Sequence, residues 1–206
     1  MGTLPFVAEQ RVVLDNISWS TYFAILKDAE GRRGRIAFDN GVLEITSPSK
    51  LHEKIKTLIA RMVETFTEEQ RIECDSAGST TFMREDLQRA FEPDECYYFA
   101  NAAMVRSKDE IDLSLDPPPD LVIQIDISRS SVPKLDLYRT LGIPEVWRYR
   151  DARLIVFVLE NTDYIEVEQS VVLPGFPVTR VQHFLDQRSE LDESALIRLF
   201  RTEIQQ

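Results

Sequence analysis

One segment near the middle of the chain constrains the fold more than any other. Residues 121–127 are apolar at every position except Gln124 and Asp126, and the triple proline at 117–119 imposes an extended entry. A nearly continuous apolar run of this length is typical of an inner β-strand that is buried on both faces. Because side chains alternate along a strand, Gln124 and Asp126 point to the same side. The segment therefore predicts a central strand that carries two polar groups on one face.

Turn residues and apolar spacing divide the N-terminal half into a helix, a hairpin and a second helix. Ser18 is placed to cap a helix over residues 19–30, which Gly31 would end. Asn40-Gly41 between two β-like runs predicts a hairpin of strands 35–39 and 42–46. Beyond Ser47-Pro48 a long helix is expected to reach residue 70. Its apolar stripe comprises Leu51, Ile55, Leu58, Ile59, Met62, Val63 and Phe66.

The remaining segments alternate between strands and helices. Short β-like runs lie at 71–76, 80–83 and 96–99, and strands are expected at 145–149, 153–160 and 164–171. Ser130 or Ser131 is placed to cap a helix over 133–140, and two closing helices are expected at 178–187 and 192–200. This mixed order predicts an α+β or α/β sandwich, and 206 residues suffice for one domain over 1–206.

Composition excludes several functional classes. The chain has 24 Lys and Arg against 35 Asp and Glu, a net charge of −11, which argues against a long basic groove that binds nucleic acid by charge alone. Two cysteines and two histidines are too few for a zinc site built of thiolates or imidazoles. No segment has the ~20 consecutive apolar residues of a membrane span, and the first residues do not show the basic segment and apolar core that are typical of a signal sequence. We therefore expect a cytoplasmic protein with no membrane partner.

Four residues are candidates for one catalytic centre: Asp94, Gln124, Asp126 and Lys134. Asp94 opens a β-like run, while Lys134 begins the helix that follows the central strand. Carboxylates from two strands can hold Mg²⁺ or Mn²⁺, which prefer oxygen ligands and retain several waters. A nearby lysine can orient the attacking water or offset charge in the transition state.

These segments resemble the Uma2 family of restriction-endonuclease-like proteins, which belongs to the PD-(D/E)XK nuclease superfamily. The likeness covers about residues 35–147. It rests on GVLEITSPS, the helix beginning at His52, AGSTTFMRED, EPDECYY, PPPDLVIQIDIS and KLDLYRTLGIPEVW. The resemblance implies a restriction-endonuclease-like mixed β-sheet flanked by helices, with an N-terminal helix and hairpin. It also implies an endonuclease that uses Mg²⁺ or Mn²⁺ to hydrolyse phosphodiester bonds of DNA.

The same resemblance assigns roles to individual residues. Asp94 matches the superfamily aspartate, position 124 the glutamate of the second acidic strand, and Lys134 a lysine that has moved from the strand to the next helix. Glu53 or His52 would match an additional ligand, so the implied metal set is Asp94, Gln124, Asp126 and Glu53. The family pattern has Glu at position 124, where this chain has the neutral Gln124, which weakens attraction for a divalent cation.

Other interpretations of these residues stay open. Asp94 is also typical of a strand-start residue held by backbone amides, and the strand acids could form a buried ion pair with Lys134 without metal. His52 and Glu53 lie in a first helical turn, where a solvated or capping role is expected. With Gln124 in place of an acid, the alternative function is a catalytically weakened or inactive oligomeric binding module. A third is a metal hydrolase that acts on small phosphates.

Two expectations concern partners. Basic residues balance the acids between positions 120 and 160, and Arg129 is placed to contact phosphate of DNA beside the metal. The last helix carries Leu196, Leu199 and Phe200 on one side, which predicts an apolar surface that pairs two subunits into a homodimer.

Overall fold

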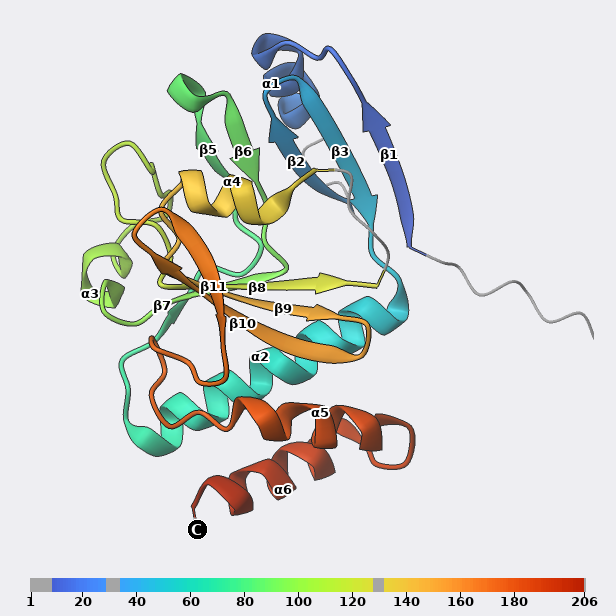
Figure 1. The fold of residues 1–206 in the computed structure, drawn as a ribbon, viewed down its shortest axis with the longest axis vertical. Helices are drawn as coiled ribbons and strands as arrows, with labels where there is room; N and C mark the ends of the chain where they lie inside the picture. The colour runs from blue at the N-terminus through green and yellow to red at the C-terminus, as the bar shows by residue number, and fades with distance from the viewer. Residues whose placement is uncertain (1–8, 29–33, 128–131, 206) are drawn as a thin grey trace, which may run out of the picture.

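The strands form two sheets that meet where the long helix α2 begins (Figure 1). The structure is a computed structural model that describes residues 9–28, 34–127 and 132–205. The expected helix stop Gly31, the caps Ser130 and Ser131, and the phosphate contact Arg129 lie outside these residues. The expected α+β class is confirmed.

The first sheet is antiparallel, with strand order β1-β3-β2-β6-β5. Its strands are β1 (Gln10–Leu14), β2 (Arg35–Asp39), β3 (Val42–Ser47), β5 (Phe82–Arg84) and β6 (Arg89–Phe91). The predicted hairpin is β2–β3, and its turn has positive φ at both Asn40 (47°) and Gly41 (92°), as a tight hairpin turn requires. Helix α1 (Trp19–Asp28) covers one face, where Tyr22 stacks on Phe38 with ring centroids 4.9 Å apart.

The second sheet is mixed, with strand order β11-β10-β9-β8-β7-β4. Its strands are β4 (Asp75–Ser76), β7 (Glu95–Tyr98), β8 (Leu121–Asp126), β9 (Glu145–Arg150), β10 (Arg153–Glu160) and β11 (Asp163–Val167). The predicted central strand is β8, and all six of its residues are buried. It pairs antiparallel with β7 and parallel with β9, and α4 (Lys134–Thr140) lies in the crossover between the parallel pair.

Helices cover both faces of the second sheet (Figure 1). Helix α2 (Lys50–Gln70) packs on one face together with α5 (Val178–Asp186) and α6 (Glu193–Ile204), and this core includes Leu121, Ile123 and Ile125 of β8. Helix α4 packs on the opposite face, against Val122. Since side chains alternate along β8, Gln124 and Asp126 share the face of Val122 and lie toward α4. One short helix, α3 (Ala102–Val105), and two 3₁₀ turns at Glu85–Leu87 and Gln187–Ser189 complete the described elements.

Several sequence predictions need correction. No strand was expected before residue 18 or at residues 89–91, where the structure has β1 and β6. Strand β11 ends at Val167, not at residue 171, and α6 extends to Ile204.

The apolar side of α6 does not form a free surface: Leu196 and Phe200 are fully buried against the chain's own core, and only Leu199 is exposed, at 47%. Helix α6 therefore does not present the apolar surface on which the predicted homodimer would form. None of the helices in the described part of the chain is long and apolar enough to cross a membrane.

Candidate active site

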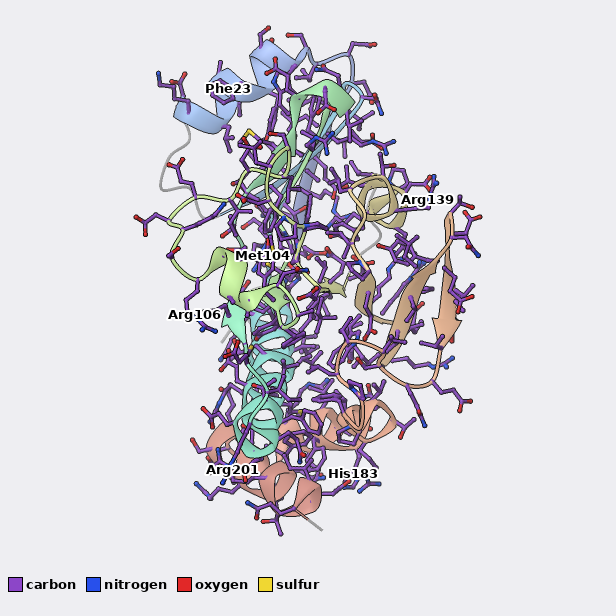
Figure 2. All side chains as sticks on the ribbon, turned by 90° about the vertical axis from the view of Figure 1, so that its left-hand side faces the viewer. Phe23, Met104, Arg106, Arg139, His183 and Arg201 are labelled. Carbon is purple, nitrogen blue, oxygen red and sulfur yellow. The ribbon has the colours of Figure 1, made fainter. Side chains whose placement is uncertain are left out.

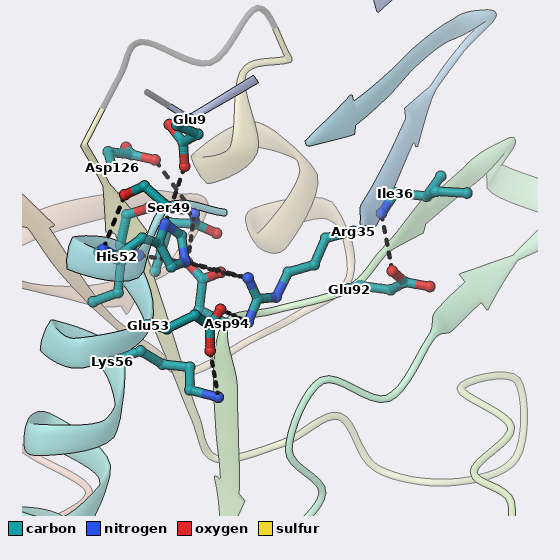
Figure 3. Close-up of polar contacts among 12 residues, drawn as sticks. Glu9, Arg35, Ile36, Ser49, His52, Glu53, Lys56, Glu92, Asp94 and Asp126 are labelled. Atoms are coloured by element: carbon teal, nitrogen blue, oxygen red, sulfur yellow. Dashed lines mark hydrogen bonds and ion pairs between the residues drawn. The ribbon is translucent and has the colours of Figure 1, made fainter. Parts of the chain in front are cut away.

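Asp94, Gln124 and Asp126 lie together at the end of β8. Figure 3 shows Asp94 and Asp126 next to the first turn of α2. The antiparallel register pairs Glu95 with Ile123, and its continuation places Asp94 opposite Gln124. Asp126 follows two residues later on the same face of β8. The period-two spacing and the β7–β8 pairing thus bring the three predicted side chains to one point.

Asp94 is buried, with 2% of its surface exposed, and both of its carboxylate oxygens accept hydrogen bonds. Oδ2 accepts from the side-chain Nε2 of Gln124 at 2.9 Å and from the backbone N–H of Ile125 at 2.6 Å. Oδ1 accepts from His52 Nε2 at 2.9 Å and lies 3.2 Å from Arg35 Nη1. Burial raises the pKa of Asp94, but the hydrogen bond from His52 and the charges of His52, Arg35 and Lys134 outweigh burial and lower the pKa to about 2. Asp94 is therefore a carboxylate at neutral pH.

Gln124 bridges the two carboxylates. Its Nε2 lies 2.9 Å from Asp94 Oδ2 and 3.3 Å from Asp126 Oδ1, while its Oε1 accepts a 2.7 Å hydrogen bond from the hydroxyl of Tyr138 on α4. The other oxygen of Asp126, Oδ2, accepts from Arg148 Nε at 2.6 Å. The amide nitrogen therefore occupies the point on which oxygens of both acids converge.

His52 connects this cluster to the start of the described chain. Its Nε2 faces Asp94, and its Nδ1 donates to Glu9 Oε1 at 3.0 Å. Burial lowers the pKa of His52, but hydrogen bonds to Asp94 and Glu9, together with the charge of Asp94, outweigh burial and raise the pKa to about 9. The imidazolium thus carries a positive charge between two carboxylates at neutral pH.

The solvated or capping role expected for His52 is wrong, because only 2% of the residue is exposed. Its backbone N–H is capped by Ser49, but its ring lies between Glu9, Arg35 of β2 and Asp94. Glu53, the other first-turn candidate, is half-exposed and pairs with Arg35 at 3.1 Å and with Lys56 at 3.3 Å. Its carboxylate therefore pairs with cations around the cluster and does not face the point between Asp94 and Asp126, where a metal ligand would have to lie.

Lys134 begins α4, and its charge contributes to the lowered pKa of Asp94. The ion pair that the structure gives Asp126 is with Arg148, whereas the alternative interpretation without metal predicts a pair with Lys134. The sequence does not predict Arg35, Arg148 or the Tyr138 hydroxyl as parts of the site, although each contacts Asp94, Asp126 or Gln124. An arginine at an inward position of the strand next to β8 was the one signal in the sequence that could have identified Arg148.

The donor chemistry of the cluster fits a hard divalent cation. Two carboxylates face one point, and a half-turn of the Gln124 amide would direct Oε1 to that point as a third oxygen. The hydroxyl of Tyr138 can accept from the turned amide as well as donate to it in its present position. Within the described ranges no group of three or more His, Cys, Asp or Glu side chains could hold a metal ion, so protein carboxylates would supply two ligands at most. Mg²⁺ commonly binds through one or two carboxylates and retains waters.

Comparison with known proteins places the chain in a family. No curated protein is significantly similar to it. One similar solved structure is described as a "putative nuclease belonging to DUF820" from Anabaena variabilis; it is 16% identical, with a TM-score of 0.48, and the match covers 80% of this chain and 90% of that one. The model of the Uma2 family, described as "Putative restriction endonuclease", matches residues 19–191. The chain therefore belongs to the Uma2 family.

Proposed function

We propose that the protein is a Mg²⁺- or Mn²⁺-dependent endonuclease that hydrolyses phosphodiester bonds of DNA at the Asp94–Gln124–Asp126 cluster. Membership of a family described as restriction endonucleases supports a nuclease. One observation carries the finer proposal: the carboxylates of Asp126 on β8 and of Asp94, which directly precedes β7, converge on one point, where the charge of Lys134 also acts on Asp94. Two acids and a lysine are the groups that metal-assisted phosphoryl transfer needs.

Each residue of the cluster has a role in this proposal. Asp94, Asp126 and the turned amide of Gln124 would hold the cation. When bound, the cation would lower the pKa of a coordinated water and neutralise charge on the scissile phosphate. His52 and Arg35 orient Asp94 through its Oδ1, and the backbone N–H of Ile125 holds its Oδ2. Lys134 would position the attacking water or stabilise developing negative charge.

A second candidate is a binding module of nuclease fold that does not cleave. It is favoured by the ion pairs that the carboxylates already form. Asp94 pairs with His52 and Arg35, and Asp126 pairs with Arg148. These cations compensate the two acids without a metal. The cytoplasmic location and the homodimer stay predictions under either function.

The experiment is a cleavage assay on supercoiled DNA, linear DNA, RNA and small phosphate esters, with Mg²⁺, with Mn²⁺ and with EDTA. We expect DNA cleavage with either metal, none with EDTA, and a loss of about 100-fold or more in Asp94→Asn and in Lys134→Ala. Asp109→Asn and Lys27→Ala alter the same residue types at exposed positions and should cleave like the unaltered protein. Full activity in Asp94→Asn would reject the assignment. DNA binding without cleavage would favour the module, and hydrolysis of small esters alone would identify a different hydrolase.

A further inference from the structure

A groove of about 660 Å³ lies between the start of α1, strand β5 and the loop at residues 110–114. Its apolar lining comes from Trp19, Phe23, Met83 and Ile111. None of its lining residues is among the hydrogen-bond partners that the structure gives Asp94 or Asp126. Figure 2 shows Phe23 on α1 at one end of the molecule, whereas His183 and Arg201 of α5 and α6 lie at the other end. The groove is thus distinct from the candidate active site.

The rim of the groove is acidic. Four of its residues are acids: Glu85, Asp86, Glu110 and Asp112. Arg84 is the basic residue of the lining, and its guanidinium binds both oxygens of Asp86, at 2.8 and 2.7 Å. The hydrogen bond from Arg84 lowers the pKa of Asp86, and hydrogen bonds from Ser114 lower the pKa of Asp112. Neither Glu85 nor Glu110 has a side-chain partner among the residues that the structure describes.

The aromatic rings of Trp19 and Phe23 line the same groove as these acids. Trp19 is fixed by ring contacts with Tyr22 and Phe38, at centroid distances of 5.0 and 5.5 Å. Phe23 is 49% exposed, and Leu115, which follows the lining residue Ser114, is 84% exposed. Aromatic faces attract cations, and a lysine or arginine held between a ring and a carboxylate gains from both interactions. Exposed apolar side chains next to such a site can pack against apolar residues that adjoin the basic residue in a bound peptide.

From this arrangement we infer that the groove docks a basic, partly apolar polypeptide segment of a partner protein. The occupant presents a lysine or arginine to the rings and the carboxylates, and its neighbouring aliphatic side chains cover Phe23 and Leu115. DNA and RNA do not fit, because the rim would repel their phosphates. The inference is independent of the proposed nuclease activity, since the groove and the Asp94 cluster share no residue.

The test is calorimetric titration of the full chain with two capped pentapeptides, one alternating lysine or arginine with leucine and one alternating glutamate with leucine. We expect the basic peptide to bind in a salt-sensitive manner and the acidic peptide not to bind. Glu85→Gln with Glu110→Gln, and separately Phe23→Ala, should each weaken binding at least fivefold. The matched control is Glu166→Gln with Glu168→Gln, which removes the same charge from exposed positions at β11 and should change affinity less than twofold.

Each other outcome would overturn the inference. Failure of the basic peptide to bind would remove the site. An equal loss in the control would assign the binding to the overall net charge of −11. Binding of spermidine as tightly as the peptide would identify a small-polyamine site, and a dimer in sedimentation that the Phe23→Ala variant abolishes would assign the groove to a second copy of the chain. Thermal unfolding of every variant, followed by circular dichroism, separates loss of the groove from loss of the fold.

Discussion

The side-chain amide of Gln124 donates to Asp94 across the β7–β8 pair, with 2.9 Å between Nε2 and Oδ2. The same nitrogen lies 3.3 Å from Asp126 Oδ1. A neutral donor thus separates two buried carboxylates at the point where the proposed cation would bind. Gln124 stabilises the cluster without metal, and the amide must turn before the cluster can offer three oxygens to a cation.

Replacing Gln124 by glutamate should exchange stability for cation affinity. The substitution removes the donor between Asp94 and Asp126 and adds a third acid, so the free energy of unfolding at pH 7 without divalent ions should fall by about 2–3 kcal/mol. Mn²⁺ should bind more tightly and restore that stability. Denaturant titrations with EDTA and with Mn²⁺ measure both effects. Gln169→Glu, at an exposed position, is the matched control. A Gln124→Glu protein as stable in EDTA as the unaltered chain would contradict this account of the amide.

His52 should make stability depend on pH above neutrality. The folded-state pKa of about 9 lies above the ordinary value of 6.5, so the protonated ring favours the folded state. The stabilisation is fully present below pH 6.5 and is lost as the pH rises through 9. This loss amounts to about 3 kcal/mol for a shift of that size. Denaturant titrations from pH 6 to 10 should show the decline in the unaltered chain and in His183→Gln, but not in His52→Gln. An equal decline in His52→Gln would show that another group is responsible.

Arg148 should matter more to stability than its neighbour Arg150. Arg148 binds Asp126, whose side chain is 2% exposed, whereas Arg150 binds Asp151, whose side chain is 87% exposed. Arg148→Met leaves a buried carboxylate without its cation and should lower the free energy of unfolding by roughly 2–3 kcal/mol. Arg150→Met should cost less than about 0.5 kcal/mol. Adding Asp126→Asn to Arg148→Met should recover most of the loss.

The same substitution also tests the cation site. Arg148 and a metal would compete for Asp126, so the Arg148→Met variant should bind Mn²⁺ more tightly than the unaltered chain in calorimetry. Unchanged affinity would indicate that Asp126 is not a ligand.

Glu145 should be a structural acid, separate from the candidate site. It is fully buried at the start of β9, where its carboxylate accepts from Trp147 Nε1, the Ser170 hydroxyl and the backbone N–H groups of Val171 and Val172. In Glu145→Gln the amide NH₂ would face groups that are themselves donors, so some of these hydrogen bonds would be lost. The free energy of unfolding, measured in denaturant titrations, should fall by about 2 kcal/mol. Glu160→Gln, at the exposed end of β10, should have little effect. Equal stability of the two variants would contradict this role.

The sequence predicts those parts of the fold and site that depend on local pattern. The alternation in β8 placed Gln124 and Asp126 on one face, and Asn40-Gly41 predicted the β2–β3 hairpin. Strand β1 was missed because it is an edge strand whose Val12 and Leu14 are exposed, so its residues show no buried face. Its pairing with β3 depends on residues about 30 positions away.

The partners of Asp94 and Asp126 could not be predicted for the same reason. His52 is 42 positions from Asp94, and Arg148 is 22 positions from Asp126. A histidine in the first turn of a helix, or an arginine on a strand, can point into solvent as readily as it can pair with a buried carboxylate. The buried arrangement is selected by the approach of the first turn of α2 to Arg35 and Asp94, and by the pairing of β9 with β8.

The most direct test of the proposed centre is the position of Mn²⁺ in crystals soaked with that ion, found by anomalous diffraction. The account predicts one strong peak at coordination distance from an oxygen of Asp94 and an oxygen of Asp126, with the Gln124 amide turned so that Oε1 faces the metal. The peak should be absent from crystals of Asp94→Asn. A peak elsewhere, or none at saturating Mn²⁺ while His52, Arg35 and Arg148 keep their contacts with the two acids, would contradict it.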